Sequence, residues 1–342
     1  MIGLRASRKD AEKARRFLAK HALLDNHYKI YGDNSFIYLP VLQNTEDKKV
    51  KSTAEKLGAK VVKANFERAE NPSAYRQILR KKLGKRYDDI TKSYDIIGNI
   101  ALIDVKGKAA KQTAKAIMET NKNVETVISK DSAVGGKYRT RKYRHILGKK
   151  NFVATYRENG VVLKFDIRKT FFSSRLAFDR LRIARLVKKG ENVLVMFAGM
   201  GPFAIEIAKM QRDSNVVGIE LNRSAYNYMT QNIALNKAPN VTAELGDVKK
   251  VANRYKRFAD RIVMPLPTDA FSFLGAVLKV ARKGCVVHYY AFGERESAFK
   301  ENAKLVKEFF LEHDRKIRIL DKRVVRQYSP KEVEIVLDIR IN

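Results

Sequence analysis

Two glycines and an acid stand at a spacing typical of a ligand site in an open α/β sheet. Gly199 and Gly201 follow the apolar run 193–196 and precede a second apolar stretch, which predicts a strand, a tight turn and a helix. Glycines let the backbone turn sharply, and the free N–H groups of the helix start can bind an anionic or polar ligand. Glu220 ends the next apolar run about 20 residues later, where an acid meets a ribose in nucleotide-binding folds.

Two more polar or constrained features end the following apolar runs. Asp247 ends the run 241–247, and the run 261–267 ends in Pro265 and Pro267. Parallel strands meet at their carboxyl ends, where open α/β sheets bind ligands. Ala204 replaces the third glycine of a dinucleotide fingerprint, and no Gly-Lys-Ser/Thr follows, so a P-loop is excluded. The alternative for a single glycine turn is a connection without a ligand, but four features at successive strands favour a binding site.

The elements around this site predict an α/β fold with three domains. Residues 169–342 contain the four strands, a helix at 298–311 and closing strands at 316–325 and 333–341, and they form the catalytic domain. Residues 1–72 and 73–168 form two smaller α/β domains. The first has a helix at 8–23, with Ala11, Ala14, Phe17, Leu18 and Ala22 on its apolar face, strands at 28–31 and 35–41 around the turn 32–34, a helix at 46–57 and a strand at 60–66.

The second small domain contains a basic segment that is a candidate for contacts with nucleic acid. A strand pair at 93–105 bends at Gly98, and a helix at 108–120 and a strand at 124–129 follow. The run 138–146 after them is basic and contains two tyrosines. Such a run is a solvated face or a segment that contacts phosphates and bases.

The composition favours a polyanionic partner. Lys and Arg number 70 against 37 Asp and Glu, a net charge of +33, and phosphate neutralisation drives nucleic-acid binding. Lysine enrichment in a heat-loving organism would raise Lys and Glu together and does not explain the excess of base. Residues 1–72 are then interpreted as an RNA-docking domain, with a structural appendage as the alternative.

The remaining composition excludes several classes. Cys285 is the single cysteine, so an internal disulfide is impossible and a cytoplasmic protein is the simplest case. No run is apolar enough for a membrane span or a secretion signal. We expect no bound metal, because no His, Cys and Asp cluster has ligand spacing. His145 and His288 are interpreted as packing residues or RNA contacts.

A helix that begins at residue 174 carries a candidate proton acceptor. Leu176, Asp179, Arg180 and Ile183 fall on one side of it. Arg175 and Asp179 stand four residues apart and could form a surface pair.

The order of the turn and acids resembles class I (Rossmann-like) S-adenosylmethionine-dependent methyltransferases. A narrower resemblance rests on the stretches 93–101, 138–142, 156–160, 171–180, 196–203 and 218–222. Together they are similar to the archaeal and eukaryotic tRNA (guanine-N1)-methyltransferases that modify guanosine 37 beside the anticodon. The resemblance covers most of the chain, including the small N-terminal domain with which that family touches the tRNA outer corner. It implies a cytoplasmic tRNA-processing enzyme that binds S-adenosyl-L-methionine and RNA, and we expect a monomer.

The resemblance also implies roles for individual residues. Asp179, where many relatives have Glu, would take the N1 proton of guanine, and Arg139 would steady the charge that develops on O6. Cofactor contacts are implied for Phe172, Arg175, Phe197, Gly199, Gly201, Phe203, Glu220, Asn222, Asp247 and Val248. Substrate or turn positions are Tyr138, Arg141, Pro265 and Pro267.

Guanine chemistry requires such groups. N1 holds its proton at neutral pH, so methylation needs a general base, and a guanidinium is a suitable donor for the charge left on O6. Arg175, Arg180 and Arg182 should favour the ionised form of Asp179. A stacked guanosine must swing out, and Phe and Tyr rings can hold it.

One departure from the family concerns the target atom. The family usually has Asn-Leu-Pro after the fourth strand, where Asn helps to orient the base, but here Pro265 replaces Asn. The change is drift in a stiff turn or a sign of an altered base pocket. An archaeal subgroup also methylates C7 of 4-demethylwyosine in wyosine biosynthesis, and Pro265 fits that subgroup. The alternatives are an aminocarboxypropyl transferase that acts on the wyosine precursor, which looks shorter at its N-terminus, and a non-catalytic tRNA-binding protein.

Overall fold

The computed structural model describes residues 1–21, 23–25, 28–33, 35–42, 47–67, 74–132, 135–136 and 138–342. Contacts divide the chain into two units, each described by itself. The first unit comprises Met1–Lys92 and Gly107–Lys122, and the second comprises Ser93–Lys106 and Asn123–Asn342. This grouping joins most of the expected middle domain to the catalytic part of the chain, and the three-domain division stays a prediction.

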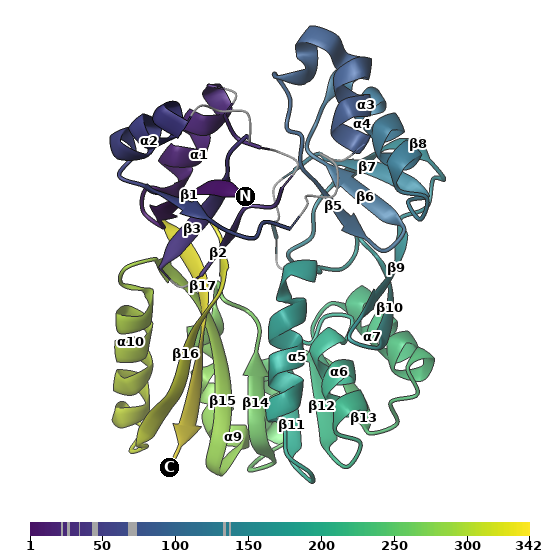
Figure 1. The fold of residues 1–342 in the computed structure, drawn as a ribbon. Helices are drawn as coiled ribbons and strands as arrows, with labels where there is room; N and C mark the ends of the chain where they lie inside the picture. Colours follow the sequence, from purple (N-terminus) through teal and green to yellow (C-terminus); the bar gives the residue numbers. More distant parts are fainter. Residues whose placement is uncertain are drawn as a thin grey trace. The chain divides into compact units, whose positions relative to one another are not determined.

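The N-terminal part of the first unit is an antiparallel sheet with helices on one side (Figure 1). The strand order is β2-β3-β1-β4. Apolar side chains of β1, β3, α1 and α2 form one core, which includes Leu4, Leu18 and Leu39. The elements are β1 (Ile2–Ser7), α1 (Ala11–Lys20), β2 (Tyr31–Gly32), β3 (Phe36–Pro40), α2 (Asp47–Lys56) and β4 (Lys60–Lys63).

The sequence predictions for this sheet were partly right. Both helices and the three strands exist near the expected positions, but the expected strand at 28–31 is only the two-residue β2. The prediction missed β1, which pairs with both β3 and β4 and is therefore central. The expected positions Ala22, Asn34 and Glu46 lie outside the described residues.

The rest of the first unit is a helix pair. Helix α3 (Ala74–Leu83) continues into the short 3-10 helix Gly84–Tyr87 and packs against α4 (Gly107–Thr120). Lys82 of α3 and Glu119 of α4 form an ion pair at 2.8 Å. The helix predicted at 108–120 is confirmed as α4, and its residues Ala110, Ala114 and Ile117 are buried.

The second unit begins with two small sheets. The first has the order β5-β6-β7-β8 and the second is the hairpin β9-β10. Gly98 makes the predicted bend between β5 and β6 at φ 59°, and a Cβ there would lie 2.1 Å from the Thr155 carbonyl oxygen, so only glycine fits. The strands are β5 (Tyr94–Ile97), β6 (Ile100–Ile103), β7 (Thr126–Lys130), β8 (Tyr143–Gly148), β9 (Val153–Glu158) and β10 (Val161–Asp166).

The large sheet of the second unit is doubly wound and Rossmann-like. Its order is β13-β12-β11-β14-β15-β17-β16, and all neighbouring pairs are parallel except those of β17. The order reverses between β11 and β14, which creates the crevice where such sheets bind ligands. The strands are β11 (Asn192–Met196), β12 (Asn215–Glu220), β13 (Val241–Leu245), β14 (Ala259–Met264), β15 (Ala281–Glu294), β16 (Ile317–Gln327) and β17 (Glu332–Ile341).

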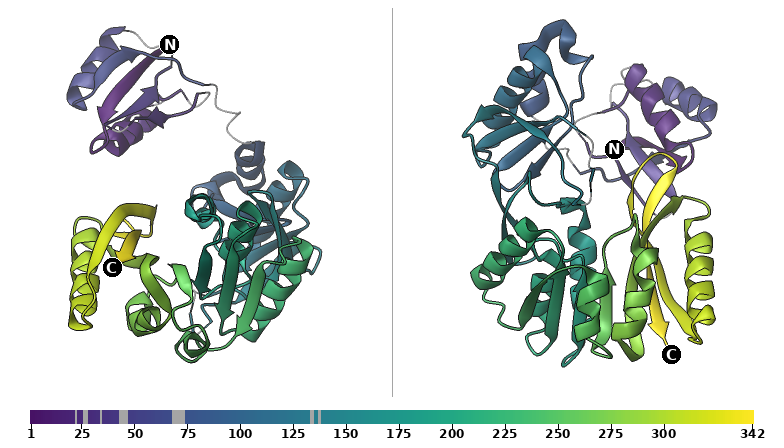
Figure 2. Two further views of the ribbon diagram at one scale, coloured as in Figure 1. Left: turned by 90° about the horizontal axis from the view of Figure 1, so that it is seen from below. Right: turned by 180° about the vertical axis from the view of Figure 1, so that it is seen from behind.

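Helices cover both faces of this sheet because its central strands are apolar on both sides. In β11, Val193 and Val195 belong to the core shared with α5, α6 and α7, whereas Leu194 and Met196 belong to the core shared with α8, α9 and α10. Figure 2 shows α10 beside the β15–β17 part of the sheet from two further directions. The helices are α5 (Ala177–Leu186), α6 (Pro202–Met210), α7 (Arg223–Leu235), α8 (Val248–Val251), α9 (Leu274–Val280) and α10 (Ala298–Glu312).

Candidate active site

A cavity of about 420 Å³ opens at the carboxyl ends of β11, β12, β13 and β14. Twelve of the sixteen residues expected in the site line it, from elements far apart in the sequence. They are Tyr138, Arg139, Phe172, Phe197, Gly199, Phe203, Glu220, Asn222, Asp247, Val248, Pro265 and Pro267. The fold thus gathers the turn, the two acids and the proline pair at one edge, together with a loop of the small sheet.

The glycine turn connects β11 to α6 through an unusual backbone. Phe197, Gly199 and Gly201 all have positive φ, of 58°, 60° and 94°. A Cβ on Gly201 would also lie 3.0 Å from side-chain atoms of Ile205 and Met229, so packing requires glycine there. A Cβ on Gly199 would meet no protein atom within 4 Å, and this position leaves space on the cavity side. Left-handed Phe197 is a strained conformation of the kind found at ligand sites.

Glu220 ties this turn to the next strand end. Its Oε2 accepts a 2.7 Å hydrogen bond from the Gly199 N–H, and its Oε1 accepts one of 2.7 Å from the Asn222 N–H. Burial raises the pKa of Glu220, and the N–H groups of Asn222 and Gly199 oppose that shift. Each carboxylate oxygen retains a lone pair for a hydroxyl donor, such as a ribose hydroxyl.

Two polar residues of the cavity cap helices. The Asn222 Oδ1 accepts from the Ser224 N–H at 2.9 Å, and its Nδ2 donates to the Lys169 carbonyl at 2.7 Å. The side chain of Asn222 is therefore committed to packing. The Asp247 Oδ1 accepts from the Lys249 N–H at 2.8 Å. These caps fix the start of α7 and α8, and thereby the backbone at the cavity wall.

An aromatic wall completes the part of the cavity near β13. Phe197 and Phe273 meet edge to face with ring centroids 4.7 Å apart, and the Lys249 ammonium lies 4.8 Å from the Phe273 ring. Val248 lines the same cavity. Flat apolar walls of this kind suit a heterocyclic ring.

Arg139 reaches the cavity from the loop before β8. Its Nη1 donates to the Thr268 Oγ1 at 2.8 Å, and its guanidinium lies 5.1 Å from the Phe171 ring. Its Nε is buried and has no partner among the described residues. Burial lowers the pKa of Arg139, and the negative charge of Glu334 opposes the shift. Its backbone has φ 51°, so a half-buried cation is held in a strained loop at the site.

Glu334 and Arg326 form an ion pair in the lining of the main cavity. The Arg326 Nε donates to the Glu334 Oε2 at 2.5 Å, and the two residues belong to the neighbouring strands β16 and β17. Glu334 is 1% exposed. Pro265 lines the same cavity at the tip of a turn in which the Leu266 N–H donates to the Met264 carbonyl.

Asp179 does not line this cavity. It is 5% exposed on α5 and lines a smaller hollow of about 210 Å³ with Arg175, Phe178, Arg323, Val324 and Val325. Its Oδ1 accepts from the Arg182 Nε at 2.6 Å, and its Oδ2 accepts from the Tyr290 hydroxyl. Burial, then the charge of Asp179, raises the pKa of Tyr290 well above its ordinary value, so Tyr290 stays a donor.

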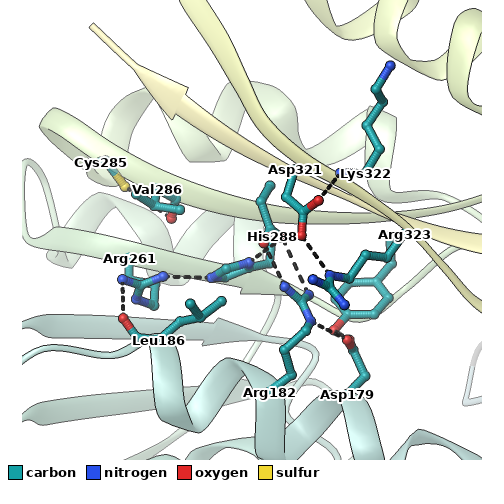
Figure 3. A network of polar contacts seen from close by, with 12 residues as sticks. Asp179, Arg182, Leu186, Arg261, Cys285, Val286, His288, Asp321, Lys322 and Arg323 are labelled. Atoms are coloured by element: carbon teal, nitrogen blue, oxygen red, sulfur yellow. Dashed lines mark hydrogen bonds and ion pairs between the residues drawn. The ribbon is translucent and has the colours of Figure 1, made fainter.

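A buried polar chain continues from Asp179 (Figure 3). The Arg182 Nη1 donates to the Asp338 Oδ2 at 2.6 Å, and Asp338 contacts the His288 Nδ1 at 2.6 Å. The Arg261 Nη1 lies 2.8 Å from the His288 Nε2. Since Arg261 can only donate, His288 accepts at Nε2 and carries its proton on Nδ1. Burial lowers the pKa of His288, so it is neutral near pH 7 and Arg182 supplies the charge that faces Asp338.

This chain corrects two expectations. Arg175 does not pair with Asp179; its Nη2 donates to Asp95 at 3.3 Å. Arg180, expected beside Asp179, makes two 2.6 Å hydrogen bonds to Glu158 instead. His288 is fully buried, so it is a packing residue and not an RNA contact. The expected buried face of α5 is confirmed, since Asp179, Arg180 and Ile183 are all buried on it.

Four expected site residues lie outside the lining of the main cavity. Gly201 caps α6 behind it, and Arg175 and Asp179 line the smaller hollow. Arg141 has a buried Nε with no partner among the described residues, and it does not line the main cavity. Of these four residues, only Gly201 belongs to the glycine turn, and none of them lines the main cavity.

Sequence reasoning missed several lining residues. Phe273, Thr268, Arg326 and Glu334 were not expected there. The alternation within 332–341 places Glu334 on the same face as the exposed Glu332 and Arg340, so the local pattern does not predict that Glu334 is buried in the cavity. Phe273 lies between helices and carries no local signal either.

The arrangement can bind a ligand with a ribose-like diol and a flat ring, beside a guanidinium and a carboxylate that face a second planar group. Within the described ranges, no three His, Cys, Asp or Glu side chains lie together in a way that could hold a metal ion. No described helix combines the length and apolar character needed to cross a membrane.

Comparisons with known families match the chain in three segments. Residues 154–320 match a TRM5/TYW2 methyltransferase domain. Residues 3–49 match a tRNA methyltransferase 5 N-terminal domain, and residues 75–151 match a TYW2 N-terminal domain. The three segments follow one another along the chain without overlap.

Individual relatives extend these matches. The chain is 36% identical over 345 residues to the tRNA (guanine(37)-N(1))-methyltransferase Trm5b of Pyrococcus abyssi, with 100% of this chain and 99% of that protein covered. It is 33% identical over 258 residues to the tRNA 4-demethylwyosine(37)-methyltransferase Taw21 of Saccharolobus solfataricus, with 74% and 95% covered. A solved complex of aTrm5 with tRNALeu superposes with a TM-score of 0.69 at 30% identity, with 100% of both chains covered.

Proposed function

The chain belongs to the TRM5/TYW2 methyltransferase family, and we propose that it transfers a methyl group from S-adenosylmethionine to N1 of guanosine 37 in tRNA. The observation that carries this proposal is the shared cavity. One wall holds the glycine turn and Glu220, and the other holds Arg139 from a separate sheet. A methyltransferase needs both a cofactor cradle and a group that faces the acceptor base.

The residues of the cavity fit S-adenosylmethionine. The space at Gly199 leaves room beside the backbone, Glu220 can accept from ribose hydroxyls, and Phe197 and Phe273 offer flat walls for adenine. When bound, the cofactor supplies an electrophilic methyl group on its sulfonium. The chain itself has to orient the base, remove a proton and exclude water.

Arg139 and Asp179 carry the proposed acid-base work. Arg139 donates to O6 of guanine and stabilises the charge that forms there when N1 loses its proton. Asp179 accepts that proton, which requires one of its present hydrogen bonds, to Arg182 or Tyr290, to be exchanged for the base. Phe171 and Tyr138, both partly or largely exposed near Arg139, can pack on the swung-out base.

The excess of basic residues and the N-terminal domain support tRNA as the partner. The net charge is +33, and the solved relative with tRNALeu covers the whole chain. We propose that the protein acts as a monomer in the cytoplasm, touches the anticodon loop near the cavity and touches the outer corner through residues 1–72. Removing those residues should weaken tRNA binding more than cofactor binding. Equal tRNA affinity without them would make the domain an appendage.

A second candidate activity is methylation of C7 of 4-demethylwyosine at the same position. The similarity to Taw21 and the replacement of the family Asn by Pro265 favour it. The aminocarboxypropyl transferase has less support, since residues 3–49 match the N-terminal domain of tRNA methyltransferase 5. A non-catalytic tRNA-binding protein would leave the strained, open glycine turn without a purpose.

The test is methyl transfer from radiolabelled S-adenosylmethionine to three tRNAs. They are a transcript with guanosine 37, the same transcript with adenosine 37, and a tRNA that carries 4-demethylwyosine. Label on the first alone supports the single activity, and label on the first and third supports both. Label on none, with normal cofactor binding by calorimetry, would contradict the proposal.

A further inference from the structure

Glu334 is a buried acid of the main cavity with no role in the reaction as described so far. It is 1% exposed, and its side chain reaches the cavity from β17. Its Oε2 accepts from Arg326, whereas its Oε1 has no hydrogen-bond partner among the described residues. Since Oε1 is also absent from the fully enclosed unpaired atoms, it remains accessible. A buried carboxylate with one oxygen bonded and the other available can accept a hydrogen bond from a ligand.

The neighbours of Glu334 define what that donor can be. Both Glu334 and Arg139, the proposed O6 donor, line the main cavity, and the negative charge of Glu334 acts on Arg139. An arginine offers only N–H groups, and an ionised carboxylate only accepts. The lining therefore presents both a donor and an acceptor.

Guanine displays the complementary pair on its Watson–Crick edge. O6 is an acceptor and the N2 amino group is a donor, and they flank N1 on either side. An acceptor that stayed on N1 itself would stand in the path of the incoming methyl group. The free oxygen of Glu334 therefore fits the N2 amino group, while Arg139 fits O6 and N1 stays open between them.

Pro265 makes such a contact necessary. It lines the cavity and has no side-chain donor or acceptor. Other polar residues in this part of the lining are Thr268, which is bonded to Arg139, and Asp269, which is exposed at the rim. Within the described lining, Glu334 is the buried side chain that can accept from the amino group.

We infer that Glu334 selects guanosine by accepting a hydrogen bond from its N2 amino group while Arg139 holds O6. This inference rests on the proposed function and names the recognition element of the same site. Arg326 positions the carboxylate, because its Nε holds Oε2 and leaves Oε1 available. The contact does not require Glu334 to exchange a proton.

Inosine tests the contact directly, since it keeps O6 and N1–H but lacks the N2 amino group. Methyl transfer is measured on two tRNAs that differ only in guanosine or inosine at position 37. The wild-type protein should prefer guanosine in kcat/KM by about ten- to a hundredfold, the effect of one hydrogen bond to a charged group. Equal rates on the two tRNAs would overturn the inference and leave the proposed function intact.

Variants assign the preference to the residue. In Glu334→Gln the amide oxygen stays with Arg326, since arginine can only donate, and the NH₂ group then faces the amino group of the base. The preference for guanosine should fall to about twofold or less. Asp269→Asn, an exposed acid on the same rim, should keep the wild-type preference.

Two readouts distinguish a change in base recognition from a loss of folding or of activity. Glu334→Gln should bind S-adenosylmethionine by calorimetry like the wild type, which shows that the cavity is folded. A wild-type preference that survives in Glu334→Gln, or that is lost in Asp269→Asn, would overturn the assignment. Absence of wild-type transfer to guanosine 37 would remove the proposed function and this inference with it.

Discussion

Arg182 should be the residue of α5 on which the buried polar chain depends most. It is the cation between Asp179 and Asp338, with 2.6 Å hydrogen bonds to each of them, and its own side chain is 10% exposed. In Arg182→Met, an apolar chain of similar length leaves both carboxylates buried without their counter-charge. Tyr290 still donates to Asp179 and His288 still donates to Asp338. The variant therefore loses two short charge-assisted hydrogen bonds and a longer one of 3.4 Å to Asp338, but each carboxylate keeps one partner.

The magnitude follows from those two bonds. A hydrogen bond to a charged group contributes about 1.5–3 kcal/mol, so two contribute about 3–6 kcal/mol. Removing one member of a buried ion pair costs about 3–5 kcal/mol, which agrees. The free energy of unfolding should fall by about that amount at pH 8, measured by urea denaturation because urea does not screen charges. The control is Arg185→Met, an exposed arginine on the same helix, which should change stability by about 0.5 kcal/mol or less.

The effect should depend on pH. Burial raises the pKa of Asp338, but the hydrogen bonds from His288 and Arg182 and the positive charge of Arg182 lower it by more, so the net pKa lies below its ordinary value. A carboxyl group with a lowered folded pKa gives stability that is present above its unfolded pKa and is lost as pH falls. Without Arg182, Asp338 should protonate at higher pH, so the gap between variant and wild type should be smaller at pH 5 than at pH 8. A loss no greater than that of Arg185→Met, or a gap independent of pH, would refute the reasoning.

Three further changes test the site and its surroundings. Asp179→Asn should bind S-adenosylmethionine normally in calorimetry but slow methyl transfer by about 10²–10⁴-fold, and near-normal turnover would remove Asp179 as the proton acceptor. Glu206 has a buried Oε2 without a partner in the described structure, and burial, then the charge of Glu158, raises its pKa to about 7. The unfolded state ionises near the ordinary pKa of 4.5 and the folded state only near 7, so the wild type loses stability as pH rises between these two values. Glu206→Gln should therefore be more stable than the wild type by up to about 3 kcal/mol at pH 9 in urea denaturation, with little difference at pH 5. A difference that does not change with pH would contradict this. Gly201→Ala, at φ 94°, should lose about 1–2 kcal/mol of stability and weaken cofactor binding. Its control is Gly275→Ala in α9, where a Cβ meets no atom within 4 Å, and this variant should be neutral or stabilising. Equal effects of the two variants in thermal unfolding would count against the strain argument.

The cavity was predictable where its residues follow local rules. The glycine turn, Glu220, Asp247 and Pro265 each end an apolar run, and parallel strands bring such ends together without any knowledge of distant contacts. Arg139 was expected from the family resemblance, and the structure places it in the same lining. These residues could be predicted from the apolar runs and their order along the chain, or from a family motif.

Residues whose role depends on distant partners were not predictable. Arg175, Arg180 and Arg182 were all expected near Asp179, but only Arg182 bonds to it. The contact of Asp179 with Tyr290 and that of Arg182 with Asp338 were not expected. Helical spacing permits the pairs at three and four residues equally, so tertiary contacts decide between them. Glu334 becomes a site residue through the pairing of β17 in the sheet, and Phe273 through the packing of the 3-10 helix Ala270–Phe273 before α9.

The fold shows the same division. Strands β11, β12, β13 and β14 were recognised from apolar runs, which burial on both faces favours. Strand β15 was not among the predicted elements. Strand β1 was missed because six residues, Ile2–Ser7, with a glycine and an arginine among them, carry a weak alternation. Its central position arises from pairing with β3 and β4, which the local sequence does not encode.

The central claim is that this cavity directs a methyl group to N1 of guanosine 37. The most direct measurement is nucleoside mass spectrometry of a tRNA transcript after reaction with the wild-type protein and S-adenosylmethionine. The account predicts one new methylated nucleoside, 1-methylguanosine, and its absence when the transcript carries adenosine 37. Methylation at another atom or another position, or 1-methylguanosine formed equally without guanosine 37, would contradict it.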